Sequence, residues 1–132
     1  MKKQLFLFWS ILLATSSFGF GQKTGDDKDK HGCLASAGYT YSVIKKTCVR
    51  VFEQKIQLKE VNPNGTSASI AAVIFSEDNK KAEVFLPGLT PSQILVRKGV
   101  KDNYIWKKGG LVLSKKNGYE LRKDGKLIFS GQ

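Results

Sequence analysis

Apolar and polar residues alternate with a period of two over most of the chain after residue 55. Ile56 and Leu58 alternate with polar neighbours, and "SIAAVIFS" at 69–76 is apolar on both faces, as in a strand that is covered on both sides. The spacing of the later runs, about 8 to 12 residues with turn-forming Gly, Lys, Asn and Asp between them, predicts an antiparallel meander. About seven or eight short strands in this length indicate a mainly β fold, a small antiparallel barrel or sandwich. The later runs are "AEVFLPG", "SQILVR", "NYIW", "LVL", "YEL" and "KLIF".

Alternation along these strands also predicts the core. Tyr104 and Trp106 should share one sheet face, with Ile105 on the other. We predict that Trp106 is mostly buried and that its indole N–H is hydrogen-bonded. The other expected core residues are Leu111, Leu113, Tyr119, Leu121, Leu127 and Phe129.

The segment before the strands has a longer period. Ile44, Cys48, Val51 and Phe52 follow the i, i+4, i+7, i+8 spacing of one helical face. Ser42 can cap the first turn, because its hydroxyl can accept a hydrogen bond from a free backbone N–H. The sequence therefore predicts a short amphipathic helix over 42–52, packed on the barrel.

The N-terminal residues have the pattern of a secretory signal peptide. Lys2 and Lys3 precede an apolar run that is too short to span a membrane, and small residues end it at Gly19 and Gly21. Cleavage before Gln22, without a lipid anchor, would leave a protein with no transmembrane segment, periplasmic or secreted. The expected division is a signal peptide at 1–21, a flexible polar leader at 22–32, a disulfide-stapled helical module at 33–56 and a β-barrel domain at 57–132.

The chain has two cysteines and one histidine. Outside the cytoplasm, two cysteines in a small chain favour a disulfide. A metal site would need a fourth ligand besides His31, Cys33 and Cys48, and a redox pair would need a C-x-x-C spacing. We predict a Cys33–Cys48 disulfide that contributes on the order of 3 kcal/mol, no bound metal, and a solvated His31.

The net charge is +11, or +9 once Lys2 and Lys3 have been removed, and the segment 97–126 alone carries +7. This charge favours acidic partners such as anionic glycans or other anionic polymers, or it simply keeps a secreted protein soluble. The single histidine lies in the polar leader, so no Ser-His-acid or Cys-His arrangement is present, nor a phosphate-binding glycine loop. We expect a protein that is not an enzyme, with no cofactor and no specific nucleic-acid partner.

Two stretches resemble known families. "HGCLASAGYTYSVIKKTCVRVFE" at 31–53 resembles a four-cysteine module of small secreted bacterial proteins, in which Ser42 and a residue near Ile56 occupy the other two cysteine positions. The resemblance implies that Cys33 pairs with Cys48. Residues 72–130 resemble the MliC-like domain, through "AEVFLPG", an aromatic-x-Trp-x-Lys-Gly motif at 104–109 and "GYELRKDGKLIF". That family consists of bacterial inhibitors of C-type lysozyme with a small antiparallel β-barrel fold.

The MliC-like resemblance implies an inhibitory site. Members of the family insert a loop into the lysozyme cleft, where a Ser and a Lys hydrogen-bond the catalytic carboxylates. The Lys corresponds to Lys108 of "WKKG", and the nearest Ser is Ser92, because the family's S-G-x-x-Y motif is absent. The loop 89–103 is the discriminating feature: a rigid finger that carries Ser92 or Lys98 beside Lys108 would support inhibition. Lysines at the rim of such an interface, for which we take Lys115 and Lys123, should contribute little.

A second hypothesis is a non-catalytic module that binds glycan or an anionic cell-envelope polymer. The basic strands, with Arg97 and Lys98, would supply charge. Exposed members of Tyr104, Trp106 and Tyr119 would supply a flat platform. A projecting loop beside Lys108 favours inhibition, whereas exposed flat aromatic rings favour glycan binding.

Overall fold

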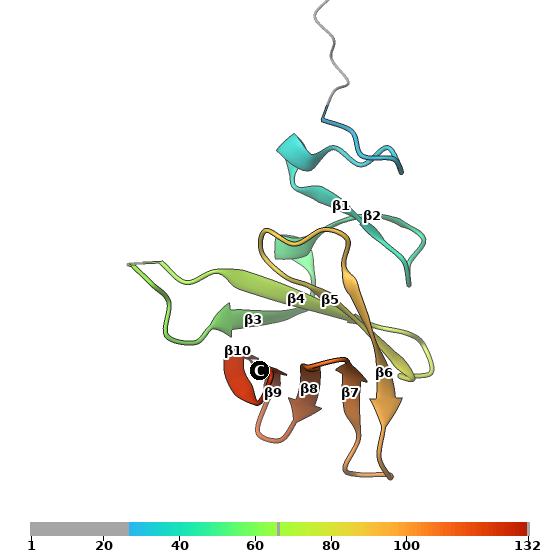
Figure 1. The fold of residues 1–132 in the computed structure, drawn as a ribbon. Helices are drawn as coiled ribbons and strands as arrows, with labels where there is room; N and C mark the ends of the chain where they lie inside the picture. Colours follow the sequence, from blue (N-terminus) through green and yellow to red (C-terminus); the bar gives the residue numbers. More distant parts are fainter. Residues whose placement is uncertain (1–26, 66, 132) are drawn as a thin grey trace, which may run out of the picture.

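The computed structural model describes residues 27–65 and 67–131. Eight antiparallel strands close into a barrel, and a two-stranded hairpin lies on its outside (Figure 1). This confirms the mainly β class and the small antiparallel barrel of about seven or eight strands. The predicted signal peptide and residues 22–26 of the predicted leader lie outside the described residues. No helix among the described residues is long and apolar enough to cross a membrane.

The barrel is a meander. Each strand pairs with the next along the chain, and β10 then pairs with β3 to close it. At this seam Phe129 lies opposite Glu60, and Ser130 lies opposite Lys59. The strands are β3 (Ile56–Glu60), β4 (Ile70–Phe75), β5 (Lys81–Phe85), β6 (Gln93–Lys98), β7 (Ile105–Lys108), β8 (Leu111–Lys115), β9 (Tyr119–Lys123) and β10 (Lys126–Gly131).

The barrel interior is filled by alternate residues of the strands. Leu58, Leu95, Leu113 and Leu121 are fully buried there. Trp106 is 8% exposed, and its indole N–H donates to the Asn79 carbonyl at 2.8 Å, which confirms both parts of its prediction. Of the other expected core residues, Leu111, Leu113, Leu121 and Phe129 are buried, and Tyr119 packs against them.

Leu127 does not join this core. The pairing of β10 with β9 shifts between Leu127 and Phe129, so that Leu127 lies opposite Arg122 while Phe129 lies opposite Leu121. A bulge adds one residue to a strand and reverses the alternation beyond it. Leu127 therefore shares the outward side of Arg122, and Phe129 points inward.

The expected helix over 42–52 is wrong, because this segment is a β-hairpin. β1 (Tyr39–Ser42) pairs with β2 (Thr47–Arg50), and short 3-10 turns, η1 (Ala35–Ala37) and η2 (Val51–Glu53), flank it. Aromatic and β-branched residues fill the two strands, and these favour β structure. Lys46, at φ 55°, closes the four-residue turn between the strands. Four apolar positions with helical spacing did not outweigh these local preferences.

The predicted disulfide is present, but it holds the hairpin. Cys48 of β2 is bonded to Cys33, and their Cα atoms lie 5.6 Å apart. The hairpin covers the outer face of β4 and β5, where Val49 of β2 packs with Ala72, Ile74 and Phe85. This cover explains why the "SIAAVIFS" segment is apolar on both faces: one face lines the barrel and the other contacts the hairpin.

The described part of the expected flexible leader, 27–32, forms a turn. The Asp29 carboxylate accepts hydrogen bonds from the backbone N–H groups of His31 and Cys33, at 2.8 and 2.9 Å. Lys28 forms an isolated β-bridge with Leu34. His31 is exposed, as expected, and its ring stacks on Tyr41 with ring centroids 3.7 Å apart. The sequence period alone missed this turn because polar side chains, rather than apolar ones, hold it.

Candidate functional site

Two lysines, Lys108 and Lys123, lie at the same end of the barrel, which we call the lysine mouth. Trp106 and Leu121 lie in the core, so Lys108 and Lys123, two residues further along β7 and β9, occupy the same side of their strands at the strand ends. Strand register places Lys108 opposite Leu111, and Leu111 opposite Lys123. With adjacent strands about 4.8 Å apart, the two backbones lie about 10 Å from each other.

The lysine mouth contains a small hollow of about 200 Å³. The Lys108 side chain is exposed, and its ammonium donates to the Gln93 side-chain carbonyl at 2.9 Å. Within 27–65 and 67–131 the only ion pairs are Arg50–Glu53 and Arg122–Glu120. Neither mouth lysine therefore forms an ion pair, although Asp124 lines the same hollow. The lining residues are Leu86, Leu89, Gln93, Lys108, Gly110, Leu111, Lys123 and Asp124.

The β5–β6 loop, residues 86–92, borders the mouth. Pro87 follows the last residues of β5 and has no N–H to continue the ladder. Gly88 takes a φ of 71°, a backbone conformation that side chains disfavour, and so turns the chain. Leu89 then stands 53% exposed at the loop. The loop places one exposed apolar side chain next to the two lysines.

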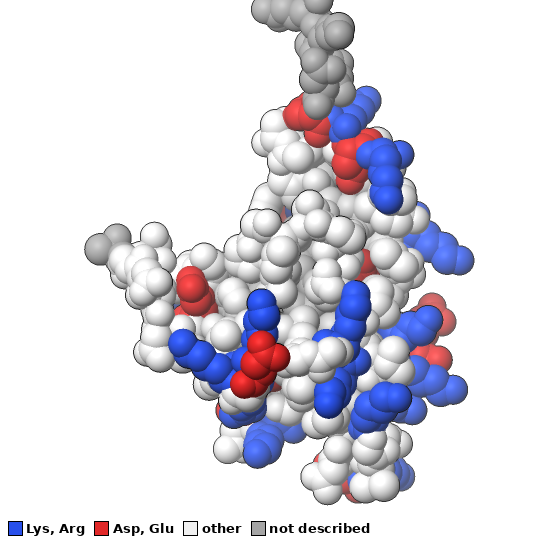
Figure 2. All heavy atoms as spheres, in the orientation of Figure 1, with Lys and Arg blue, Asp and Glu red and all other residues white. Residues whose placement is uncertain are grey.

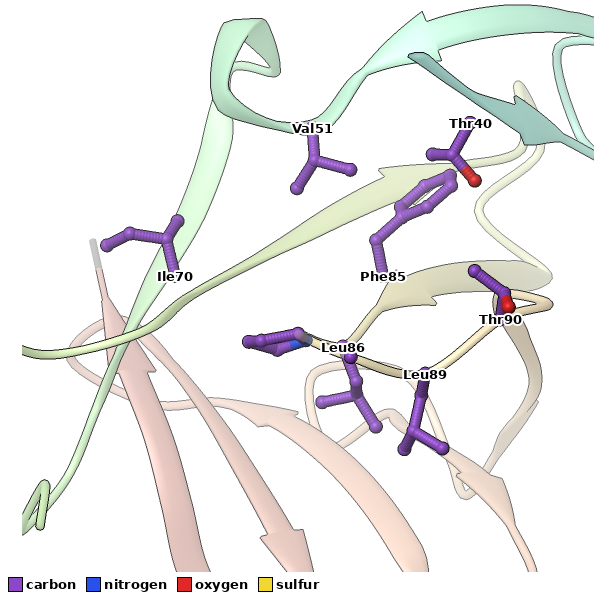
Figure 3. Close-up of a pocket in the computed structure, with 9 residues that line it drawn as sticks. Thr40, Val51, Ile70, Phe85, Leu86, Leu89 and Thr90 are labelled. Carbon is purple, nitrogen blue, oxygen red and sulfur yellow. The ribbon is translucent and has the colours of Figure 1, made fainter. Parts of the chain in front are cut away.

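The other side of the same loop lines an apolar cleft, which we call the hairpin cleft. Its volume is about 350 Å³, and Leu86 and Leu89 line both it and the mouth hollow. Figure 3 shows Val51 and Thr40 above the cleft and Phe85 and the loop below it. The β5–β6 loop is therefore the shared wall between an apolar and a cationic hollow.

Ser92 ends this loop, but its hydroxyl is already engaged. It donates to the Glu83 carboxylate at 2.5 Å. Glu83 belongs to β5 and is fully buried beneath the hairpin turn. The following residue, Gln93, is the partner of Lys108. The structure thus places Ser92 at the same barrel end as Lys108, with its hydroxyl directed to Glu83.

The other predicted site residues lie at the opposite end. Lys98 pairs with Ile105 at the far end of β6, and the Arg97 guanidinium lies over the Tyr104 ring, 4.2 Å from its centroid. The loop 89–103 does not form a finger beside Lys108, because residues 93–98 form a barrel strand. A six-residue strand spans about 20 Å, which keeps Lys98 away from Lys108.

Tyr104, Trp106 and Tyr119 do not form the flat exposed platform that glycan binding would use. Trp106 is buried, and Tyr104 and Tyr119 pack against the core. Lys115 covers Tyr119 at 5.1 Å from the ring centroid, as Arg97 covers Tyr104. Ring faces that are covered by cations or core side chains are closed to a stacking sugar.

Charge is distributed unevenly over the molecule. On the face shown in Figure 2, Lys and Arg side chains outnumber acidic ones over the barrel, and acidic and basic side chains mix in the segment before the hairpin. The described carboxyl groups with a lowered pKa lie at turns outside the lysine mouth. Hydrogen bonds from the Ser36 hydroxyl, the Cys33 backbone N–H and the Ser76 hydroxyl lower the pKa of Asp27, Asp29 and Asp78, respectively.

No group of three or more His, Cys, Asp or Glu side chains suited to a metal ion occurs in the described part of the chain. Comparisons of the chain with protein-family models, with curated proteins and with solved structures find no match.

The sequence analysis did not predict three residues that line the lysine mouth: Leu89, Gln93 and Lys123. Lys123 was expected to be a rim lysine comparable to Lys115, yet it lines the hollow with Lys108. The sequence does contain a signal for it. Each mouth lysine ends a strand and lies two residues after an inward-facing core residue. Because side chains alternate between the two faces of a strand, the lysine side chain lies on the inward side at the barrel opening.

Proposed function

We propose that this protein is a non-catalytic, exported inhibitor of a lysozyme-type glycosidase, and that it binds the enzyme with the lysine mouth and the β5–β6 loop. The observation that carries the proposal is the pair Lys108 and Lys123, free of ion pairs, beside the exposed Leu89. The MliC-like resemblance of residues 72–130 and the barrel architecture support the same reading.

The chemistry of the two partners is complementary. Glycosidases of this kind carry two carboxyl groups in their cleft. A lysine ammonium forms charge-assisted hydrogen bonds to carboxylates that are stronger than those to a neutral amide. Lys108 would therefore exchange its contact with Gln93 for one with a carboxylate. Because Ser92 is held by Glu83, we assign the second donor to Lys123 instead of the family serine.

The test is inhibition by the purified mature protein of lysozymes of several classes, both basic and acidic. We expect Lys108→Ala to weaken binding by about 2 to 5 kcal/mol, as for loss of one desolvated charged contact. Lys115→Ala is the matched control, because Lys115 also ends a strand but lies at the opposite end of the barrel, and it should cost under about 1 kcal/mol. Lys123→Ala should resemble Lys108→Ala.

Equal and small losses for Lys108→Ala and Lys115→Ala would point to diffuse electrostatic binding. A wild-type protein that inhibits no lysozyme class would remove the proposal altogether.

A second candidate function is binding of an anionic cell-envelope polymer. It is favoured by the outward positions of β6–β8, which carry Lys98 and Lys107 but no acidic residue. This function would show strong salt dependence and little sensitivity to Lys108→Ala alone, because many weak contacts share the charge. Binding of the purified protein to a soluble anionic glycan at rising salt measures it.

A further inference from the structure

Glu83 is a buried carboxylate that the proposed inhibition does not use. It is 0% exposed and sits on the outer side of β5, under the turn of the β1–β2 hairpin. No described Lys, Arg or His forms an ion pair with it. A buried carboxylate without a cation must be held by hydrogen bonds, and the loss of these would leave it uncompensated.

Four donors from two separate segments converge on this carboxylate. The hairpin turn gives three: the Ser42 hydroxyl at 2.7 Å and the backbone N–H groups of Val43 and Ile44 at 2.7 and 3.1 Å. The β5–β6 loop gives the fourth, the Ser92 hydroxyl at 2.5 Å. The hairpin turn is thus built around a side chain of the barrel, and the same side chain holds the end of the loop.

The contacts continue from Glu83 to the lysine mouth. Ser92 is followed by Gln93, whose side-chain carbonyl accepts the hydrogen bond from the Lys108 ammonium. The loop that ends at Ser92 also supplies Leu86 and Leu89 to the hollow. A displacement of the hairpin turn would therefore shift the Glu83 carboxylate, and with it the β5–β6 loop that borders the lysine mouth.

We propose that Glu83 is a positioning residue that couples the disulfide-held hairpin to the lysine mouth, so that the hairpin regulates the geometry of the inhibitory site. Its relevance to inhibition rests on the proposed function, whereas the coupling itself is a property of the fold. Hydrogen-bond networks in buried surroundings act cooperatively, so breaking one member weakens the others.

The Glu83→Gln variant is not a silent replacement. Each carboxylate oxygen accepts one backbone N–H, Oε1 from Val43 and Oε2 from Ile44. An amide has only one acceptor oxygen, so in either orientation its NH₂ group faces a backbone donor. At least one of these bonds must break, and we expect the hairpin turn to loosen.

Ser42→Ala provides the sharper test, since it removes two hairpin contacts, the bond to Glu83 and the one accepted from the Lys45 N–H at 3.0 Å, and none from the loop. In amide hydrogen exchange on the exported, disulfide-intact protein, we expect about five-fold faster exchange in residues 86–92 as well as in 43–46. The exchange of β8 and β9 should stay unchanged, which excludes general destabilisation. We also expect the Gln93 side-chain amide resonances to shift, because they report on the hydrogen bond from Lys108. If Ser42 only stabilised the hairpin, these resonances would not change.

Ser76→Ala is the matched control. Ser76 likewise uses its hydroxyl within a turn, donating to Asp78 at 2.7 Å, but it has no contact with the β5–β6 loop. It should leave residues 86–92 and the Gln93 amide unchanged. Ser92→Ala removes the loop's own hydrogen bond to Glu83. Its change in the exchange of residues 86–92 is therefore the reference against which the smaller change in Ser42→Ala is compared.

An unchanged loop and an unchanged Gln93 amide in Ser42→Ala would overturn the coupling, even if the wild type inhibits a lysozyme. Conversely, a wild type without inhibition would remove the proposed function while the exchange and resonance results still decide the coupling. If Ser42→Ala fails to fold, the same measurements on Glu83→Gln and Ser92→Ala test the coupling. Faster exchange of the loop in Ser92→Ala without any change in residues 43–46 would also refute a shared network.

Discussion

Asp29 illustrates how a single side chain organises the segment before the hairpin. Its carboxylate caps the backbone N–H groups of His31 and Cys33, and the disulfide follows directly at Cys33. Such local side-chain-to-backbone bonds are typical of Asp in turns. One carboxylate thereby fixes the entry of the chain into the hairpin unit.

This cap should be sensitive to acid. The Cys33 N–H holds the pKa of Asp29 below its ordinary value of 3.8, so the cap stabilises the fold above that pH and is lost as the pH falls through the lower folded-state pKa. We expect the amides of His31 and Cys33 to shift and exchange faster below about pH 4. Asp29→Asn should remove this acid transition, as followed by nuclear magnetic resonance. A transition that survives in Asp29→Asn would assign it to another carboxyl group.

At the residue scale, the sequence predicted what depends on local alternation. Trp106 could be placed in the core because its strand alternates cleanly. Glu83 could not, because in "AEVF" it occupies an ordinary outward polar position of a strand. It is buried only because the hairpin covers that face, and this contact joins residues about 40 positions apart in the chain. The role of Ser92 was hidden for the same reason.

At the scale of elements, the hairpin behaves as a unit held by the disulfide. Cys33 lies 1% exposed, outside both hairpin strands, and its bond to Cys48 closes a loop of 15 residues in sequence. Short hairpins are marginal by themselves, so this one depends on its covalent link and on the apolar contact with β4 and β5.

We therefore expect the double variant Cys33→Ser, Cys48→Ser to lose hairpin stability by on the order of 3 kcal/mol while the barrel stays folded. Amide exchange should accelerate in β1 and β2 and stay constant in β8 and β9. Mass spectrometry of the wild type should show a mass about two hydrogens below that of its reduced form. Free thiols in wild type purified under non-reducing conditions, or identical exchange in the variant, would contradict this role.

The misassigned helix has a physical explanation at the same scale. A helical period supported by four apolar positions cannot be distinguished from a hairpin whose turn shifts the alternation between two strands. Here the turn at 43–46 separates Tyr41 from Cys48, which lie opposite each other. The barrel strands, in contrast, had clear turn sequences between them, and their number and order could be predicted.

At the scale of the whole molecule, the positive charge should govern the rate of encounter. The chain carries +11 in total, and the expected mature form +9. A basic lysozyme would be repelled at long range and an acidic one attracted, whereas desolvated contacts at the lysine mouth act only after docking. Sequence composition predicts this field, but only the closed barrel shows that Lys108 and Lys123 share one opening.

The salt dependence of binding kinetics separates long-range charge, which acts on association, from the contacts at the lysine mouth, which act on dissociation. Because screening shortens from about 30 Å at 0.01 M to about 8 Å at 0.15 M salt, the association rate with a basic lysozyme should rise with salt, and that with an acidic one should fall. Dissociation should change little with salt but accelerate in Lys108→Ala, and Lys115→Ala should alter association alone. Stopped-flow mixing measures both rates. A dissociation rate that rises steeply with salt, equally in both variants, would show that screened surface charge rather than the lysine mouth holds the complex.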